Sequence, residues 1–212
     1  MNNESRILVL APHTDDAELG CGGTMAKWLQ AGSEVHVAVF STAKESLPPG
    51  SPETLLADEF YAAMDTFPIP RERTTVLDYP VRRLSYHRQE VLEDMVRLRD
   101  RIQPHLVLVP SVHDVHQDHQ VVHAEAVRAF RNCGLWGYEL PWNHFQFSTQ
   151  AYVSLSEDHI AAKLRSLQAY HSQISIGRSY FKSDFVRGLA RTRGVQIGED
   201  MAEAFEVIRM RF

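Results

Sequence analysis

Short aliphatic runs alternate along the chain with longer segments that have helical periodicity. The aliphatic runs are rich in β-branched residues and have the length of strands, and they lie at 6–11, 34–41, 74–79 and 105–110. The helical segments lie between them, at 23–31, 53–66 and 87–103. Because strands that alternate with helices form βαβ units, this pattern predicts a mainly parallel sheet that is covered by helices on both faces.

The last third of the chain has a less regular pattern. Strand-like runs lie at 147–155 and 204–210, and helix-like segments lie at 157–170 and 180–191. No linker rich in proline, glycine or serine separates this part from the first half, so we expect one domain over 1–212. The predicted fold class is α/β, a Rossmann-like three-layer fold with a mainly parallel sheet and a less regular C-terminal part.

Composition excludes several classes of protein. A chain of 212 residues with 44% hydrophobic content is long enough to bury a sizeable core. Its formal net charge of −5 argues against a broad basic surface, so we expect no nucleic-acid partner. The two cysteines, Cys21 and Cys133, do not make a disulfide framework. We predict neither a signal peptide nor a transmembrane segment, which makes a cytoplasmic location the expectation.

Titratable residues follow two of the predicted strands. The strand at 6–11 leads into HTDD at 13–16, and the strand at 105–110 leads into HDVHQDH at 113–119. In the common strand order 3-2-1-4-5 these two strands are neighbours, and open α/β sheets bind ligands at the carboxyl ends of such strands. We therefore expect the two loops to face each other across a binding site.

The residue types in these loops are those of a catalytic zinc site, which combines imidazole and carboxylate ligands with one open position for water. His13 and Asp16 from the first loop and His119 from the second would supply such a set. Two adjacent carboxylates do not easily face one ion, so we expect Asp15 and Asp16 to divide the roles of ligand and proton acceptor.

The second loop holds further candidates. The imidazole of His116, oriented by the carboxylate of Asp118, could stabilise an oxyanion or protonate a leaving amine. HQVVH at 119–123 is similar to the metalloprotease motif HExxH, but glutamine replaces the glutamate that serves there as general base. We therefore interpret His123 as structural or as a support for a neighbouring ligand.

Each loop by itself has a simpler interpretation. Asp15 and Asp16 could cap the helix that follows them, where carboxylates complement the helix dipole. His116, His119 and His123 could form a solvated helix face, since the last two lie one helical turn apart. Both clusters follow strands that are expected to be neighbours, however, and this joint occurrence favours a metal site.

The two loops together resemble the signature of the PIG-L/LmbE-like family of zinc-dependent N-acetylglucosaminyl deacetylases. The family motifs HPDDxExxxGG and HxDH are similar to HTDDAELGCGG at 13–23 and HQDH at 116–119. YHSQ at 170–173 and the stretch at 190–205 are similar to its C-terminal signature. The resemblance implies a Rossmann-like enzyme that uses Zn²⁺ to remove the N-acetyl group from an amino-sugar conjugate, such as a glycolipid, a sugar nucleotide or a related glycoside.

The resemblance also implies roles for individual residues: ligation of zinc by His13, Asp16 and His119, general-base catalysis by Asp15, and oxyanion stabilisation by His116 with Asp118 behind it. The sequence departs from the family pattern at Thr14, which replaces a proline, and at Leu56, which replaces the arginine that usually holds the substrate. We therefore expect this protein to anchor its substrate differently.

Two groups of residues are candidates for this anchoring. Arginines near the penultimate helix could clasp a phosphate, although a solvated helix face explains them equally well: Arg178, Arg187, Arg191 and Arg193. Aromatic residues could stack on a sugar ring, or could pack in the core or between the subunits of a homo-oligomer: Trp136, Tyr138, Trp142 and Phe145.

Two other functions are compatible with the sequence. One is a metal-dependent hydrolase of a different acyl bond or of a phosphoester, and phosphoester hydrolysis commonly uses two metal ions. The other is a non-catalytic, metal-stabilised sugar-binding protein. Since each residue type that a deacetylase needs is present, we expect catalysis of amide hydrolysis on a small-molecule substrate.

Overall fold

A computed structural model describes residues 5–211 of the chain. Its seven-stranded sheet has the order β3-β2-β1-β4-β5-β7-β6. The strands are β1 Arg6–Ala11, β2 Glu34–Val39, β3 Thr74–Val76, β4 Leu106–Pro110, β5 Gly134–Tyr138, β6 Ala151–Ser154 and β7 Ala202–Arg209. The first five pair in parallel, whereas β7 is antiparallel to both β5 and β6. The predicted α/β class, with a mainly parallel sheet and a less regular C-terminal part, is therefore confirmed.

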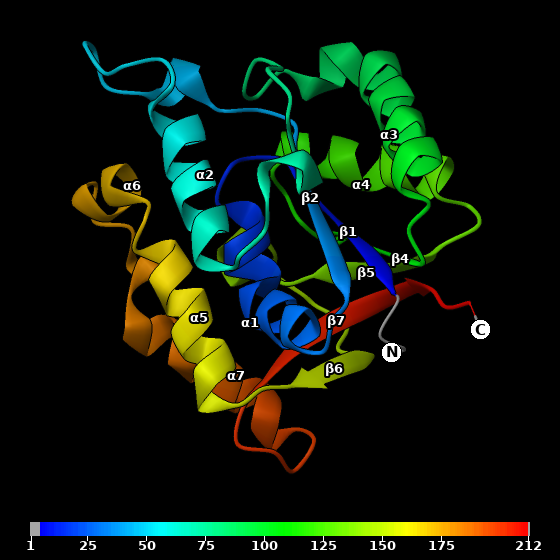
Figure 1. Ribbon diagram of the computed structural model, residues 1–212, viewed down its shortest axis with the longest axis vertical. Helices are drawn as coiled ribbons and strands as arrows, with labels where there is room; N and C mark the ends of the chain where they lie inside the picture. Colours follow the sequence, from blue (N-terminus) through cyan, green and yellow to red (C-terminus); the bar gives the residue numbers. More distant parts are fainter. Residues whose placement is uncertain (1–4, 212) are drawn as a thin grey trace.

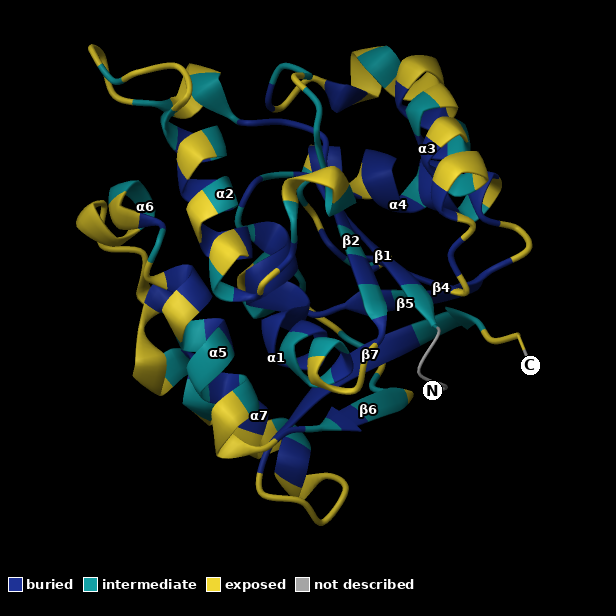
Figure 2. Ribbon diagram, in the orientation of Figure 1, coloured by how far each residue is buried: buried dark blue, intermediate teal, exposed yellow. Residues whose placement is uncertain are grey.

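Helices cover both faces of the sheet (Figure 1). One face carries α1 Asp16–Gln30, α2 Leu55–Thr66, α5 Glu157–Leu167 and α7 Ser183–Val195, and the other carries α3 Arg88–Ile102 and α4 Gln117–Ala129. The short helix α6 His171–Ser175 lies beside α2. In β1, Ile7 and Val9 belong to one core, and Leu8 and Leu10 belong to the other. Burial on both faces (Figure 2) explains why this strand is a continuous aliphatic run.

Most predicted elements are present, with differences at their ends. The predicted boundaries of β1, β2, α2, α3, β4 and β7 lie within two residues of the observed ones. Those of β3, β6, α5 and α7 differ by three or four residues. Helix α1 begins at Asp16 rather than at residue 23, because the glycine-rich GCGG at 20–23 conceals its helical pattern.

Three elements are absent from the predicted pattern: β5, α4 and the short helix α6. Strand β5 contains Gly134 and Gly137, and glycine is depleted in strands. A Cβ atom at 137 would lie 2.8 Å from Glu206 Oε2 and 3.3 Å from Ser111 Cα, so glycine fits this position without displacing either neighbour. In α4 the polar residues Asp118 and His119 are buried in the first turn, so the apolar periodicity that normally marks a helix is concealed there.

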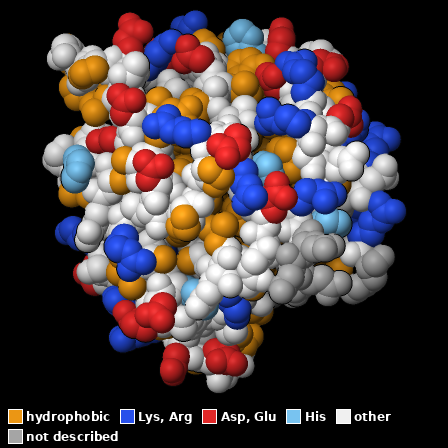
Figure 3. All heavy atoms as spheres, in the orientation of Figure 1, with side chains coloured by type: hydrophobic (Ala, Val, Ile, Leu, Met, Phe, Trp, Pro, Cys, Tyr) orange, Lys and Arg blue, Asp and Glu red, His pale blue; other side chains and the backbone are white. Residues whose placement is uncertain are grey.

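Three observations on the described chain relate to its cysteines, its helices and its surface charge. Cys21 and Cys133 are both buried and unpaired. Between residues 5 and 211, no helix combines the length and the apolar character needed to cross a bilayer. On the face shown in Figure 3, Lys and Arg side chains are interspersed with Asp and Glu side chains, so this face carries no continuous basic patch.

Helix α1 is interrupted at Cys21, whose φ of −147° and ψ of 23° are not helical. The backbone N–H groups of Gly23 and Thr24, just past the break, donate to the carboxylate of Glu203 at 3.0 and 2.7 Å. The ammonium group of Lys163 donates to the same carboxylate at 2.7 Å and to a backbone carbonyl ahead of the break at 2.8 Å. Helix α5 and strand β7 thus supply the partners that an interrupted helix needs.

The Lys163–Glu203 pair gives a test of this arrangement, because the two side chains are only 5% and 7% exposed. Lys163→Met would leave the buried carboxylate without its cation, and we expect the free energy of unfolding to fall by about 3–5 kcal/mol. Urea denaturation measures the change. Lys163→Met/Glu203→Gln removes the unpaired charge and should recover part of the loss; a double variant less stable than the single one would contradict this account.

Candidate active site

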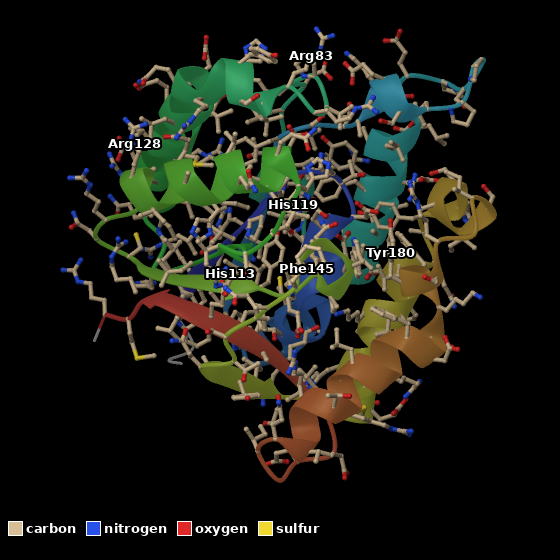
Figure 4. The ribbon with its side chains drawn as sticks, turned by 180° about the vertical axis from the view of Figure 1, so that it is seen from behind. Arg83, His113, His119, Arg128, Phe145 and Tyr180 are labelled. Carbon is tan, nitrogen blue, oxygen red and sulfur yellow. The ribbon has the colours of Figure 1, made fainter. Side chains whose placement is uncertain are left out.

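The neighbouring strands β1 and β4 bring the two titratable loops together. Ile7 pairs with Leu106 and Val9 with Leu108, so both strands end at the same edge of the sheet. The expected 3-2-1-4-5 order is therefore confirmed for this part of the sheet. Figure 4 shows His119 near the centre of the molecule, at the start of α4.

Three donor atoms from these loops lie at nearly equal distances from one another. His13 Nδ1 lies 3.2 Å from Asp16 Oδ2, His119 Nε2 lies 3.3 Å from the same oxygen, and the two nitrogens are 3.3 Å apart. Donors at 2.0–2.1 Å from a tetrahedral ion are separated by roughly 3.3 Å. The triangle formed by His13, Asp16 and His119, which we call the donor triangle, therefore has the dimensions of one face of a zinc site.

Buried carboxylates hold the outer nitrogen of each imidazole in the donor triangle. Asp114 Oδ2 lies 2.7 Å from His119 Nδ1, and Asp118 Oδ2 lies 3.1 Å from His13 Nε2. In metal sites such carboxylates orient the ring and increase its basicity. Asp114 has no predicted role, and its one signal in the sequence is a carboxylate in the loop that precedes HQDH.

Nearby carboxylates raise the pKa values of both imidazole rings. Burial by itself would lower the pKa of His13, but hydrogen bonds to Asp118 and Asp16 outweigh it and raise the pKa to about 9. Burial is likewise outweighed at His119, where Asp16 and Asp114 raise the pKa to about 10. A metal ion binds the unprotonated nitrogen, so it must displace these protons when it binds.

The expected contact between the carboxylate of Asp118 and the ring of His116 is wrong. Apart from its contact with His13, this carboxylate accepts hydrogen bonds from the backbone N–H groups of Arg82 at 2.6 Å and Leu84 at 3.2 Å. Only the backbone N–H of Asp118 reaches the ring, at His116 Nδ1 over 3.2 Å. Side chains two positions apart at the start of a helix do not face each other, which is the reason for the difference.

His116 caps helix α4 and lies against the donor triangle. Its ring centroid is 4.8 Å from that of His13 and 4.7 Å from that of His119. Because Nδ1 accepts the backbone hydrogen bond, the proton of the neutral ring is assigned to Nε2. Burial, and then the charges of His119 and His13, lower the pKa of His116 to about 4. The three histidines also form a second possible ligand set in the described chain, since one nitrogen of each lies within 4.8 Å of the others.

A cavity of about 490 Å³ opens beside the donor triangle. Apart from the loop residues and Arg178, its described wall carries no charged side chain. Its hydroxyl and amide side chains include Ser46, Ser51, Asn143, Ser172, Gln173 and Ser175. The larger apolar and aromatic ones include Leu47, Leu56, Trp142, Ile176 and Tyr180.

Asp15 and Asp16 differ in environment, as the sequence predicts. Asp15 precedes α1, but its side chain makes no capping hydrogen bond, so the helix-cap interpretation does not account for it. It lines the cavity, and burial together with the charge of Asp16 raises its pKa to about 6. For Asp16, burial acts in the same direction, but His119 and His13 outweigh it and hold the pKa well below its usual range.

The aromatic stretch near β5 separates into core and cavity residues. Trp136 and Tyr138 lie in β5, and the fully buried Tyr138 donates from its hydroxyl to a β1 carbonyl at 3.1 Å. Trp142 lines the cavity and stacks on Tyr180, with ring centroids 4.0 Å apart and an interplanar angle of 10°. Phe145 is fully exposed. Contact with a ligand in the cavity is therefore open to Trp142 alone among the four.

The predicted arginine cluster does not converge on the cavity. Arg187 pairs with Glu157, and Arg193 pairs with the buried carboxylate of Glu139. Neither these two nor Arg191 lines the cavity, whereas Arg178 does. A phosphate clasp built from α7 is therefore wrong for this site, because two of its cations already have carboxylate partners.

Two of the remaining candidates have structural surroundings. His123 is buried, and its Nδ1 donates to the carbonyl of Pro110 at 2.8 Å, which agrees with its interpretation as a structural residue. Leu56 is 4% exposed and lines the cavity from α2, so this wall is apolar where the family pattern has a cation.

Thr14 contributes its backbone to a buried hydrogen-bonded chain. The hydroxyl of Tyr170 lies 2.6 Å from the Thr14 carbonyl oxygen and 2.6 Å from Glu18 Oε1. One hydroxyl proton cannot serve two acceptors at this distance, so the proton between Tyr170 and Glu18 belongs to the carboxyl group. Burial raises the pKa of Glu18 to about 8, which agrees with a protonated carboxyl.

The sequence of this chain is similar to the sequences of known deacetylases. Residues 8–130 match the family model described as PIG-L: GlcNAc-PI de-N-acetylase. The chain is 26% identical over 178 residues to the uncharacterized deacetylase YaiS of Escherichia coli K12, covering 81% of this chain and 93% of YaiS.

Two solved structures share the fold. N,N'-diacetylchitobiose deacetylase from Pyrococcus horikoshii has a TM-score of 0.79 at 20% identity, over 96% of this chain and 84% of that one. The 4-carboxy-2-hydroxymuconate hydratase GalB from Pseudomonas putida KT2440 has a TM-score of 0.76 at 16% identity, over 98% of both chains. The same fold therefore occurs in enzymes that catalyse different reactions, so the reaction of this protein has to be inferred from the residues of its site.

The buried carboxyl of Glu18 predicts a pH dependence of stability. The folded protein keeps this proton up to about pH 8, whereas the unfolded chain loses it near pH 4.5. Between these values the folded state binds one more proton, so this group lowers the free energy of unfolding by about 1.4 kcal/mol for each unit that the pH rises. Glu18→Gln should remove that slope.

Urea denaturation of the metal-free protein at pH 5.5, 6.5 and 7.5 measures the slope. The exposed Glu72 provides the matched control, because Glu72→Gln should keep the slope of the unsubstituted protein. Parallel stability curves for the unsubstituted protein and Glu18→Gln would show that Glu18 is ionised in the folded state.

Proposed function

Because the chain belongs to the PIG-L family, we propose that it is a zinc-dependent hydrolase that removes the N-acetyl group from an amino-sugar conjugate. One observation carries the proposal: the donor triangle lies beside a carboxylate suited to act as a base, at the end of a cavity with a largely uncharged wall. A metal centre, a base and space for a neutral polyol are what hydrolysis of an N-acetyl sugar requires.

The assigned ligands are His13 Nδ1, Asp16 Oδ2 and His119 Nε2. When bound, zinc lowers the pKa of a coordinated water and polarises the carbonyl of the scissile amide. Asp114 and Asp118 keep the two imidazoles in the orientation that presents these nitrogens.

The remaining groups move the protons. Asp15, with its pKa near 6, accepts a proton from the attacking water. The Nε2–H of His116 donates a hydrogen bond to the carbonyl oxygen as negative charge develops there. The amide C–N bond then breaks, the departing nitrogen takes the proton held by Asp15, and acetate and a free amine are released.

The cavity wall favours a neutral sugar conjugate over a sugar nucleotide. Hydroxyl and amide side chains offer hydrogen bonds to sugar hydroxyl groups, and Trp142 offers an aromatic surface. A pyrophosphate needs several cations or backbone N–H groups, whereas Arg178 is the one Lys or Arg side chain on the described wall.

A panel of substrates tests the proposal. The zinc-loaded protein is incubated with N-acetylglucosamine, N,N'-diacetylchitobiose, an alkyl N-acetylglucosaminide and UDP-N-acetylglucosamine, and free amine and acetate are measured. We expect equimolar amine and acetate from at least one neutral conjugate, and less product from UDP-N-acetylglucosamine. The metal-free protein should release neither product. Stoichiometric zinc without amine release from any of the four would refute the proposed function.

Two variants separate the base from the ligands. Asp15→Asn should lower kcat by about 10²- to 10⁴-fold while zinc still binds with one equivalent per chain, because it removes only the proton acceptor. His119→Ala should lose zinc along with activity. Zinc content by atomic absorption and turnover by amine release are the measurements.

The matched control is Asp58→Asn, which changes an exposed carboxylate on α2 that does not line the cavity. It should keep both zinc and turnover. Full activity in Asp15→Asn would overturn the assignment of the base, and retained stoichiometric zinc in His119→Ala would overturn the ligand set.

A further inference from the structure

One wall of the cavity is a segment with little packing of its own. Helix α6 and the residues after it contribute Ser172, Gln173, Ser175 and Ile176 to the lining. None of the residues 171–180 is buried. Segments with few buried contacts are the parts of a fold that open most easily, so the position of this wall depends on its anchors.

Tyr170 anchors the start of this segment to the loop that holds the donor triangle. Its side chain is fully buried, and its ring packs edge-on against Phe181 with centroids 6.0 Å apart. The hydroxyl donates to the carbonyl of Thr14 at 2.6 Å. Thr14 stands directly after His13 and two residues before Asp16, so this bond ties the wall to the backbone that carries two donors.

A second contact anchors this segment to helix α2. The backbone N–H and the hydroxyl of Ser172 donate to Glu59 at 2.8 and 2.6 Å. Glu59 belongs to α2, which is beside α6 in Figure 1. This contact holds α6 against α2 without touching the donor loop, whereas the bond from Tyr170 to Thr14 joins the start of α6 directly to that loop.

We propose that Tyr170 is a positioning residue that couples metal binding to the wall of the substrate cavity. An ion in the donor triangle fixes the backbone at Thr14, and the Tyr170 hydroxyl passes this constraint to residues 171–177. Coupling of this kind is reciprocal, so a ligand that contacts the wall strengthens metal binding by the same factor. The inference rests on the proposed function only in that zinc is taken to fill the donor triangle.

Hydrogen exchange of the full chain tests the coupling, with zinc alone as the probe. In the unsubstituted protein, zinc should slow amide exchange both at 12–20 and at 171–177. In Tyr170→Phe, which keeps the ring and removes the hydroxyl, the zinc effect should persist at 12–20 and disappear at 171–177. We also expect zinc affinity to fall about tenfold in a chelator competition.

Substrate kinetics give an independent measurement. At saturating zinc, Tyr170→Phe should raise KM severalfold and change kcat little, because the wall contacts the substrate while the donor triangle is still filled. The matched control is Tyr152→Phe, which removes a hydroxyl that donates to Gln196 at 3.2 Å away from the cavity. This control should change neither the exchange pattern nor KM.

The outcomes distinguish this inference from the proposed function. Failure of the unsubstituted protein to bind zinc would overturn both. Zinc binding with equal protection of 171–177 in the unsubstituted protein and in Tyr170→Phe would overturn the coupling alone. If Tyr170→Phe does not fold, the unsubstituted protein alone still tests the coupling. Zinc that binds but leaves amide exchange at 171–177 unchanged would overturn it.

Discussion

The parallel pairing of β1 with β4 determines where the chemistry of this protein can take place. His13 and His119 are 106 positions apart in sequence, yet their ring nitrogens lie 3.3 Å from each other because the two strands end at one edge of the sheet. The strand order reverses there, since the chain leaves β1 toward β2 and returns to its other side at β4. Such a reversal leaves a crevice between the diverging connections, and the donor triangle occupies it.

Buried carboxylates then fix the loops that meet at this edge. Asp118 holds His13 and the backbone at 82–84, and Asp114 holds His119. Farther along α1, Glu203 and Lys163 satisfy the interrupted helix. A buried charge without a partner is costly, so the loss of any of these contacts would destabilise the loop or helix that it holds. These hydrogen bonds fix the positions of the two imidazoles relative to the sheet.

The two ends of the cavity differ in chemical character. The carboxylates and imidazoles that line the cavity come from the loops after β1 and β4, while the wall from α2 and α6 offers mostly uncharged contacts, with Arg178 as its charged side chain. This separation suits hydrolysis in the PIG-L family, in which one acyl group is cleaved while the rest of the molecule is only bound. The lightly packed wall at α6 is tied to the donor loop by the hydrogen bond from Tyr170 to the Thr14 carbonyl, and the proposed coupling between the metal site and the substrate cavity uses this bond.

The hydrophobic pattern and the two titratable clusters determined the α/β class, the neighbouring strands and the candidate residues, because strand periodicity and strand-end position are local properties. They did not reveal β5, where Gly137 lies against Glu206 of β7 and Gly134 lies against Leu106 of β4, or the role of Asp114. They also placed Asp118 behind His116 and left the arginines near α7 open between a phosphate clasp and a solvated helix face, whereas the structure places Asp118 against His13 and pairs Arg187 and Arg193 with carboxylates. Which partner a buried polar side chain finds depends on its direction in three dimensions and on residues far away in sequence, so only the tertiary structure decided it.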